Sequence, residues 1–356
     1  MTAVRAWPRP AVRAPAVLGT LGLAVAAAFL ASLAVGAFPI GIGRIVEILA
    51  DMVVPGVGTG SLDQDAAVLL SIRLPRAVLA VCTGAGLGMA GAVMQGLFRN
   101  PLADPAVIGV SSGAALGAAI AIVGVSLLPT AFRVAGGFLL PGAAFTSAVI
   151  TTALVYRAGR QDGASGMHSM LLAGIAFNAI AFAGVGTLSF IASDEQLRNL
   201  SFWSIGSLGQ ASRDLVMTSS IAAAVGAVLL WRLAPALNAL ALGAAEAAHL
   251  GVDVRGLERR AVLLVALVVG ALVAATGVIS FVGLVAPHIV RLACGPDHRI
   301  VLPGAALFGA ALMLAADAVA RTVAAPAELP VGVLTTAVGA PFFLGLLLRA
   351  RRASGL

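Results

Sequence analysis

Long uninterrupted runs of apolar residues alternate along the chain with short stretches that hold most of its charged residues and many of its prolines. In a helix that rises 1.5 Å per residue, about 20 apolar residues cross the roughly 30 Å hydrocarbon core of a bilayer. The pattern therefore predicts about ten transmembrane helices, over residues 17–37, 77–97, 106–128, 138–156, 168–191, 213–232, 260–281, 285–294, 301–320 and 331–349. The run at 285–294 is the shortest, and it is either a span or the continuation of a broken helix.

Composition supports an integral membrane protein. The chain has 356 residues, of which 60% are hydrophobic and 10% are charged, whereas soluble domains carry about 25% charged residues. We therefore predict one all-α transmembrane domain over residues 1–356, with a cytoplasmic tail at 1–16 and its largest cytoplasmic loop at 233–259. The first apolar run exceeds the roughly 7–15 residues of a secretory signal core, so it is expected to remain as the first span.

The distribution of positive charge predicts the orientation. Most arginines fall on the inner side if the N-terminus is cytoplasmic, as the positive-inside rule requires, and both termini are then cytoplasmic. The net charge of +7 does not indicate nucleic-acid binding, because the arginines lie in short loops between apolar runs.

All 22 basic residues are arginine, and the sequence contains no lysine. A Walker A loop needs a lysine to reach the nucleotide phosphates. Any ATP-driven activity of this chain would therefore need a partner chain that binds the nucleotide.

Two short motifs match enzyme signatures but lack the surroundings that those signatures need. The pattern Gly86-Leu-Gly88-Met-Ala-Gly91 matches a dinucleotide fingerprint but lies within a span, where Gly84 and Gly88 instead predict a small-residue face that packs closely on another helix. Gly109-Val-Ser-Ser-Gly113 matches a hydrolase elbow, but no histidine and acid accompany it. We predict no catalytic residue, metal site or cofactor. An ion channel or a purely structural bundle would not need the long polar loop or the outer arginines described below.

Several ordered motifs carry a family resemblance. They are Arg73-Leu-Pro-Arg76, Gly91-Ala-Val-Met-Gln95, Asn100-Pro-Leu-Ala103, Gly109-Val-Ser-Ser-Gly113 and the stretch from Gly277 to Arg291. The chain resembles the FecCD-type permeases, the membrane subunits of binding-protein-dependent importers for iron-siderophores, haem and cobalamin. The resemblance implies a cobalamin-permease-like bundle of a type II ABC importer in the bacterial inner membrane. It also implies a permease homodimer, two ATP-binding cassette subunits and a periplasmic substrate-binding protein as partners, with no nucleic acid.

The segments 95–105, 196–203 and 320–330 look most like haem permeases, so haem is the expected cargo. A ferric-siderophore or cobalamin permease of the same family is the alternative.

The resemblance also suggests roles for individual residues. Arg73, Arg76 and Arg321 are expected to form an outward basic patch that receives acidic residues of the binding protein, although Asp317 and Arg321, four residues apart, could equally form a local ion pair. The residues expected to couple the chain to the ATPase are Gly243, Glu246, His249, Gly251, Asp253 and Arg255. Asn178, Phe202 and Trp203 are expected near the translocation pathway, with Asn178 facing another helix or the pathway rather than lipid.

Overall fold

The computed structural model describes residues 14–36, 38–53, 64–124, 136–159, 165–325 and 327–354, and every regular element within these ranges is helical. The predicted N-terminal tail lies almost entirely outside the described residues. The first half of the described chain forms α1 (Ala14–Ala34), α2 (Ile42–Val53), α3 (Gln64–Val68), the π-helix η2 (Leu69–Arg73), α4 (Leu74–Leu97), the 3₁₀ turn η3 (Pro105–Ile108), α5 (Val110–Gly124), η5 (Gly136–Phe138), α7 (Leu139–Gly159) and α8 (Ser165–Ile191). The second half forms α9 (Asp194–Ile205), α10 (Arg213–Trp231), α11 (Ala234–Leu240), α12 (Ala244–His249), α13 (Val254–Thr276), α14 (Val282–Cys294), α15 (His298–Val323) and α16 (Val331–Ser354).

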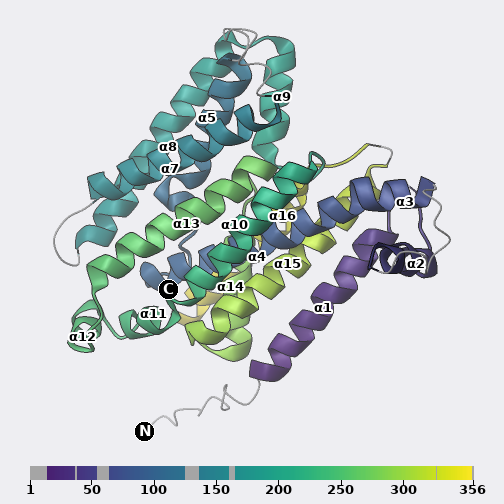
Figure 1. The fold of residues 1–356 in the computed structure, drawn as a ribbon. Coiled ribbons are helices and arrows are strands. Elements are labelled where there is room, and N and C mark those ends of the chain that lie inside the picture. Colours follow the sequence, from purple (N-terminus) through teal and green to yellow (C-terminus); the bar gives the residue numbers. More distant parts are fainter. Residues whose placement is uncertain are drawn as a thin grey trace.

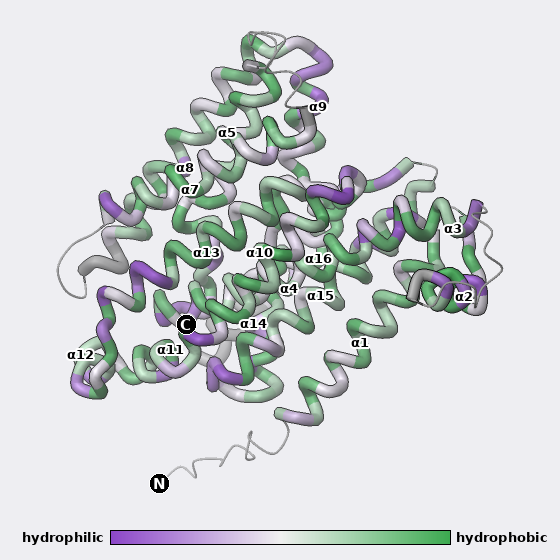
Figure 2. Tube along the Cα trace, in the orientation of Figure 1, coloured by the Kyte–Doolittle hydropathy of each residue, from purple (hydrophilic) through white to green (hydrophobic). Residues whose placement is uncertain are grey.

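Seven helices in the described part of the chain are long and apolar enough to cross a membrane: 14–34, 64–97, 139–159, 169–191, 213–231, 254–276 and 298–323. The remaining three predicted spans correspond to shorter apolar helices at 110–124, 282–294 and 331–345. The all-α membrane fold predicted from the sequence is confirmed, while the number of ten spans stays a prediction. Along the ribbon, hydrophobic residues dominate the long helices and polar residues gather towards their ends (Figure 2).

Helix α4 lies at the centre of the bundle, where α10, α13, α14 and α15 surround it (Figure 1). Glycines allow this crowding. A Cβ placed on Gly84 or Gly88 would lie 2.2 Å from a backbone oxygen of α15, and one on Gly91 would lie 1.9 Å from the Gly283 oxygen of α14. The close helix contact predicted from the Gly84 and Gly88 spacing is confirmed.

A second group of helices, α5, α7 and α8, packs together, and α13 joins it to α4 (Figure 1). Helix α9 packs on α5, while α12 lies at the opposite end of the long helices. We refer to these two ends of the bundle as the α9 end and the α12 end.

The irregular run near 285 is the separate helix α14. Residues 277–281 are not helical and separate α13 from α14, with φ at +72° for Gly277 and +68° for Phe281. Helix α14 then packs on α4 and α15. The segment is therefore a broken helix pair rather than one continuous span.

Candidate functional site

Arg73 ends the π-helix η2 and holds the last turn of α1. Its guanidinium donates hydrogen bonds to the carbonyl of Leu33 at 2.7 Å, to that of Ala34 at 3.0 Å and to that of Phe38. The last carbonyls of a helix have no partner within the helix, so a cation here satisfies and charge-stabilises them. Arg73 therefore closes the end of α1 from a position about 40 residues further along the chain.

Arg76, one turn into α4, forms a buried ion pair across to α15. Its Nε donates to Asp317 Oδ1 at 2.8 Å, and its Nη1 donates to Glu328 Oε2 at 2.6 Å. The Asp317 side chain is 0% exposed, whereas that of Glu328 is 49% exposed. Glu328 is thus the accessible member of this network.

Arg321 completes the cluster. Its Nε lies 3.1 Å from Asp317 Oδ2, and its two terminal nitrogens donate to the Ser32 hydroxyl and to the Ser32 and Val35 carbonyls of the α1 end. The local ion pair between Asp317 and Arg321 that the spacing allowed is present. The Asp317 carboxylate therefore forms ion pairs with one arginine of α4 and one of its own helix.

The structure brings the three predicted docking arginines together but does not expose them. Arg73, Arg76 and Arg321 are 5%, 4% and 8% exposed. Each guanidinium is bound to carbonyls or carboxylates of the same chain, so the expected outward basic patch is corrected to a buried charge cluster. Contact of these residues with a binding protein stays a prediction.

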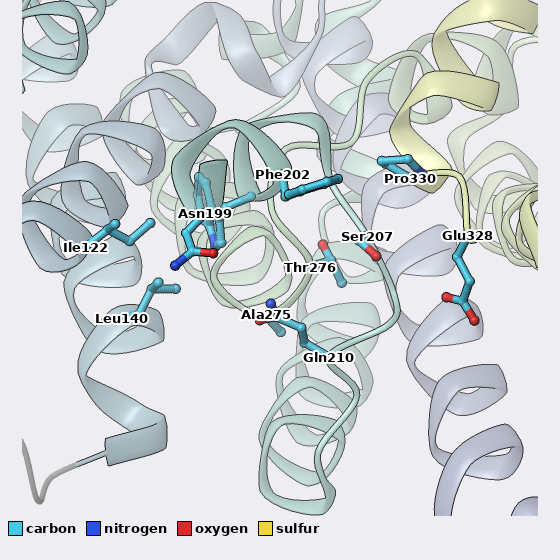
Figure 3. Close-up of a pocket in the computed structure, with 11 residues that line it drawn as sticks. Ile122, Leu140, Asn199, Phe202, Ser207, Gln210, Ala275, Thr276, Glu328 and Pro330 are labelled. Atoms are coloured by element: carbon cyan, nitrogen blue, oxygen red, sulfur yellow. The ribbon is translucent and has the colours of Figure 1, made fainter. Parts of the chain in front are cut away.

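A cavity of about 440 Å³, lined by both polar and apolar residues, opens beside this cluster at the α9 end (Figure 3). Phe202 and Trp203 from α9 line it, as do Thr276 at the end of α13 and Glu328. A capping box of Ser193 and Gln196 fixes the start of α9. Two of the three predicted pathway residues therefore line a cavity, and the Glu328 carboxylate connects that cavity to Arg76.

Asn178, the third predicted pathway residue, lies elsewhere. In α8 it accepts a hydrogen bond from the Ser112 hydroxyl of α5 and donates to the Ala106 carbonyl at 3.3 Å. This satisfies the amide between helices, which agrees with the expectation that it faces another helix. Asn178 does not line the cavity beside Glu328.

The predicted coupling residues form a helical hairpin at the α12 end, which we call the coupling segment (residues 233–259). Gly243, at φ +135°, starts α12, and Gly251, at φ +83°, turns the chain towards α13. Asp253 caps α13 by accepting from the Gly256 amide at 2.9 Å. The Glu246, His249 and Arg255 side chains are exposed.

Two apolar side chains of the coupling segment also face outward. Leu242 is 68% exposed and Leu250 is 64% exposed, on either side of α12.

Two polar connections near the α12 end were missed from the sequence. Asn238 of α11 bonds Asp297 and His298 at the start of α15. Gln95 of α4 donates to the Leu284 carbonyl of α14 at 3.3 Å and accepts from Arg291. A signal existed for the first connection: Asp297 precedes a long apolar run in the position of a helix cap, and Asn238 is the lone amide of the loop.

Asp297 is the N-cap of α15, and hydrogen-bond donors stabilise its negative charge. Partial burial acts against its charge, but the Arg299 amide at 2.9 Å and the Asn238 amide at 2.6 Å donate to its carboxylate. These donors hold the pKa of Asp297 below its usual value.

A bundle of long apolar helices with a cavity of mixed lining at one end and an exposed helical hairpin at the other has the form of a multi-span membrane transport protein. The FecCD transport family matches residues 24–349, and the chain belongs to that family. The resemblance seen in the sequence motifs is therefore confirmed.

Individual relatives agree with this assignment. The hemin transport system permease protein HmuU of Yersinia pestis is 48% identical over 282 residues, which cover 79% of this chain and 83% of that protein. The cobalamin import system permease protein BtuC of Halobacterium salinarum is 41% identical over 277 residues, which cover 78% of this chain and 72% of that protein. A solved structure described as an inward-facing metal-chelate type ABC transporter is 31% identical, with a TM-score of 0.79 over 94% of this chain and 99% of that one.

Proposed function

We propose that the chain is the permease subunit of a type II ABC importer that carries haem across the bacterial inner membrane. The observation that carries this proposal is the placement of the cavity beside Glu328 and the coupling segment at opposite ends of one helical bundle. A permease needs a mouth that receives cargo on one side and a surface that accepts an energy-supplying partner on the other.

The energy comes from separate ATP-binding cassette subunits. The chain has no lysine for a Walker A loop, and the exposed Leu242 and Leu250 offer an apolar contact flanked by Glu246 and Arg255. We assign two such subunits to a permease homodimer, with one substrate-binding protein on the other side and with both chain termini in the cytoplasm.

The coupling segment can be tested without disturbing the fold. Leu250→Asp and Glu246→Arg change exposed side chains, whereas Asp253 would be a poor choice because its substitution also removes the cap of α13. Both variants should insert normally and lose co-purification with the ATPase subunit. An exposed substitution at the α9 end, Ser201→Asp, is the matched control. If the ATPase subunit co-purified with Leu250→Asp and Glu246→Arg as fully as with the wild type, the assignment would be contradicted.

Haem is favoured as cargo by the 48% identity to a hemin permease over most of the chain. Ferric-siderophore and cobalamin transport remain the alternatives, since cobalamin permeases are also relatives. No histidine is among the cavity-lining residues of the described chain, so haem would pass without a histidine ligand at this mouth.

The deciding experiment reconstitutes the permease with its ATPase subunit and binding protein in vesicles. ATP-dependent uptake of hemin, a ferric siderophore and cobalamin is measured in parallel. We expect hemin uptake that stops when ATP is omitted. Uptake of cobalamin or siderophore with no hemin uptake would assign the chain to the alternative cargo.

The binding protein is proposed to dock near the Arg76–Glu328 pair. Arg76 is nearly buried, but its partner Glu328 is half exposed and lines the cavity rim. A carboxylate of the binding protein could approach this guanidinium only where Glu328 now lies.

A further inference from the structure

One side chain joins the coupling segment to the centre of the bundle. The Asn238 Oδ1 atom accepts from the backbone N–H of His298 at 2.8 Å and lies 2.9 Å from His298 Nδ1. Its Nδ2 donates to Asp297 Oδ1 at 2.6 Å. Asn238 belongs to α11, the first helix of the coupling segment, and all three partner groups belong to the first turn of α15 or its cap.

The His298 ring extends this connection to α4. A Cβ on Gly96 would lie 2.4 Å from His298 Nε2, so the ring lies directly against the α4 backbone. His298 is 4% exposed. Three helices, α11, α15 and α4, therefore meet at one buried imidazole.

From that point α4 and α15 run antiparallel in continuous contact. The Gly88 position faces Ala305, the Gly84 position faces Gly309, and Arg76 pairs with Asp317. Backbone-to-backbone contact along such a row leaves little room for the two helices to slide or separate. The pair therefore moves as one body.

This body spans the distance between the two candidate sites. His298 and Asp317 are 19 residues apart in one helix, which corresponds to about 29 Å at 1.5 Å per residue. One end contacts the coupling segment through Asn238, and the other holds the charge cluster and, through Arg76, the Glu328 carboxylate at the cavity rim.

We propose that Asn238 is the joint through which the coupling segment moves the α4–α15 pair, so that motion at the α12 end reaches the cavity rim at the α9 end. This inference rests on the proposed function of the coupling segment. Asn238 acts as a positioning residue: it contacts neither cargo nor nucleotide.

The test compares Asn238→Ala and Asn238→Leu with Trp231→Phe in the reconstituted complex. Trp231 of α10 also donates to the start of α15, through Nε1 to the Arg299 carbonyl at 3.4 Å, but it lies outside the coupling segment. The readouts are cargo molecules imported per ATP hydrolysed and the stimulation of ATPase by the binding protein.

Both Asn238 variants should lose imported cargo per ATP by about 5- to 150-fold, the size of a typical coupling between two sites. Stimulation of ATPase by the binding protein should fall as well, because that signal passes through the same joint in the opposite direction. Trp231→Phe should leave both ratios near those of the wild type. Unchanged ratios in the Asn238 variants, or an equal loss in Trp231→Phe, would overturn the proposal.

A second measurement does not depend on transport. In the purified chain, Asn238→Ala should speed amide hydrogen exchange in both α11 and the first turn of α15, while Trp231→Phe should affect only the latter. If Asn238→Ala does not accumulate in the membrane, His298→Ala replaces it, since it removes the ring contact and keeps the backbone hydrogen bond. Unchanged exchange in α11 would overturn the joint, whereas failure of uptake by the wild-type complex would count against the proposed function alone.

Discussion

Gly84 of α4 and Gly309 of α15 face each other with no space for a side chain between them: a Cβ added to either would lie 2.2 Å from the carbonyl oxygen of the other. The neighbour in each case is backbone, which cannot rotate away as a flexible side chain could. This contact fixes how closely the two most intimately packed helices approach.

Enlarging either glycine should therefore separate the helices. We expect Gly84→Leu to lower the unfolding free energy by at least the roughly 1–3 kcal/mol typical of overpacking, seen as a lower thermal midpoint in detergent. Gly19→Leu in α1, where no atom lies within 4 Å of the added Cβ, is the matched control. Equal midpoints for the two variants would show that the α4–α15 contact is looser than described.

Asp317 should be the least replaceable carboxylate in the cluster. Asp317→Asn leaves two buried arginines without their shared anion, and breaking a buried ion pair on one side costs about 3–5 kcal/mol. We expect most of the chain to be lost from the folded fraction on size-exclusion chromatography. Asp214→Asn, an exposed carboxylate at the start of α10, should behave as the wild type. Wild-type yield of Asp317→Asn would mean that the arginines find other partners.

Removal of the Arg73 guanidinium should loosen the end of α1 and leave the rest of the bundle intact. Arg73→Met frees three backbone carbonyls, each hydrogen bond to a charged group being worth about 1.5–3 kcal/mol. Faster hydrogen exchange confined to the end of α1 and to α2 is the expected result. Arg44→Gln, which breaks a partly exposed pair with Glu47, should change exchange little. Uniformly faster exchange in Arg73→Met would show a global rather than a local role.

The docking proposal for Arg76 can be separated from its structural role by changing Glu328 instead. Glu328→Gln keeps Arg76 paired with Asp317 and removes the charge that now covers Nη1. If a carboxylate of the binding protein competes for this position, affinity should rise several-fold at low salt and the gain should shrink at high salt. Surface binding measured at two salt concentrations decides this. Affinity that is unchanged or lower in Glu328→Gln would leave Arg76 with a structural role alone.

The sequence was informative wherever a property depends on local pattern. Apolar runs located the long helices, and the Gly84–Gly88 spacing located a close helix contact. The burial of Arg73, Arg76 and Arg321 was not predicted, because a charged residue near a helix end is expected to be solvent-exposed until its partners are known. For Arg73 and Arg321 those partners include the carbonyls at the end of α1, which lie about 40 residues from Arg73 and nearly 290 from Arg321. No local pattern encodes a hydrogen bond over such a separation.

The position of α1 has a consequence for assembly during synthesis. Most residues of α1 are not buried, and Arg73 and Arg321 donate hydrogen bonds to carbonyls of its last turn. Ribosomes make α1 long before α15, so the end of α1 lacks one of its two cationic caps until nearly 290 further residues have been added. A chain that stops short of α15 therefore keeps a half-capped α1.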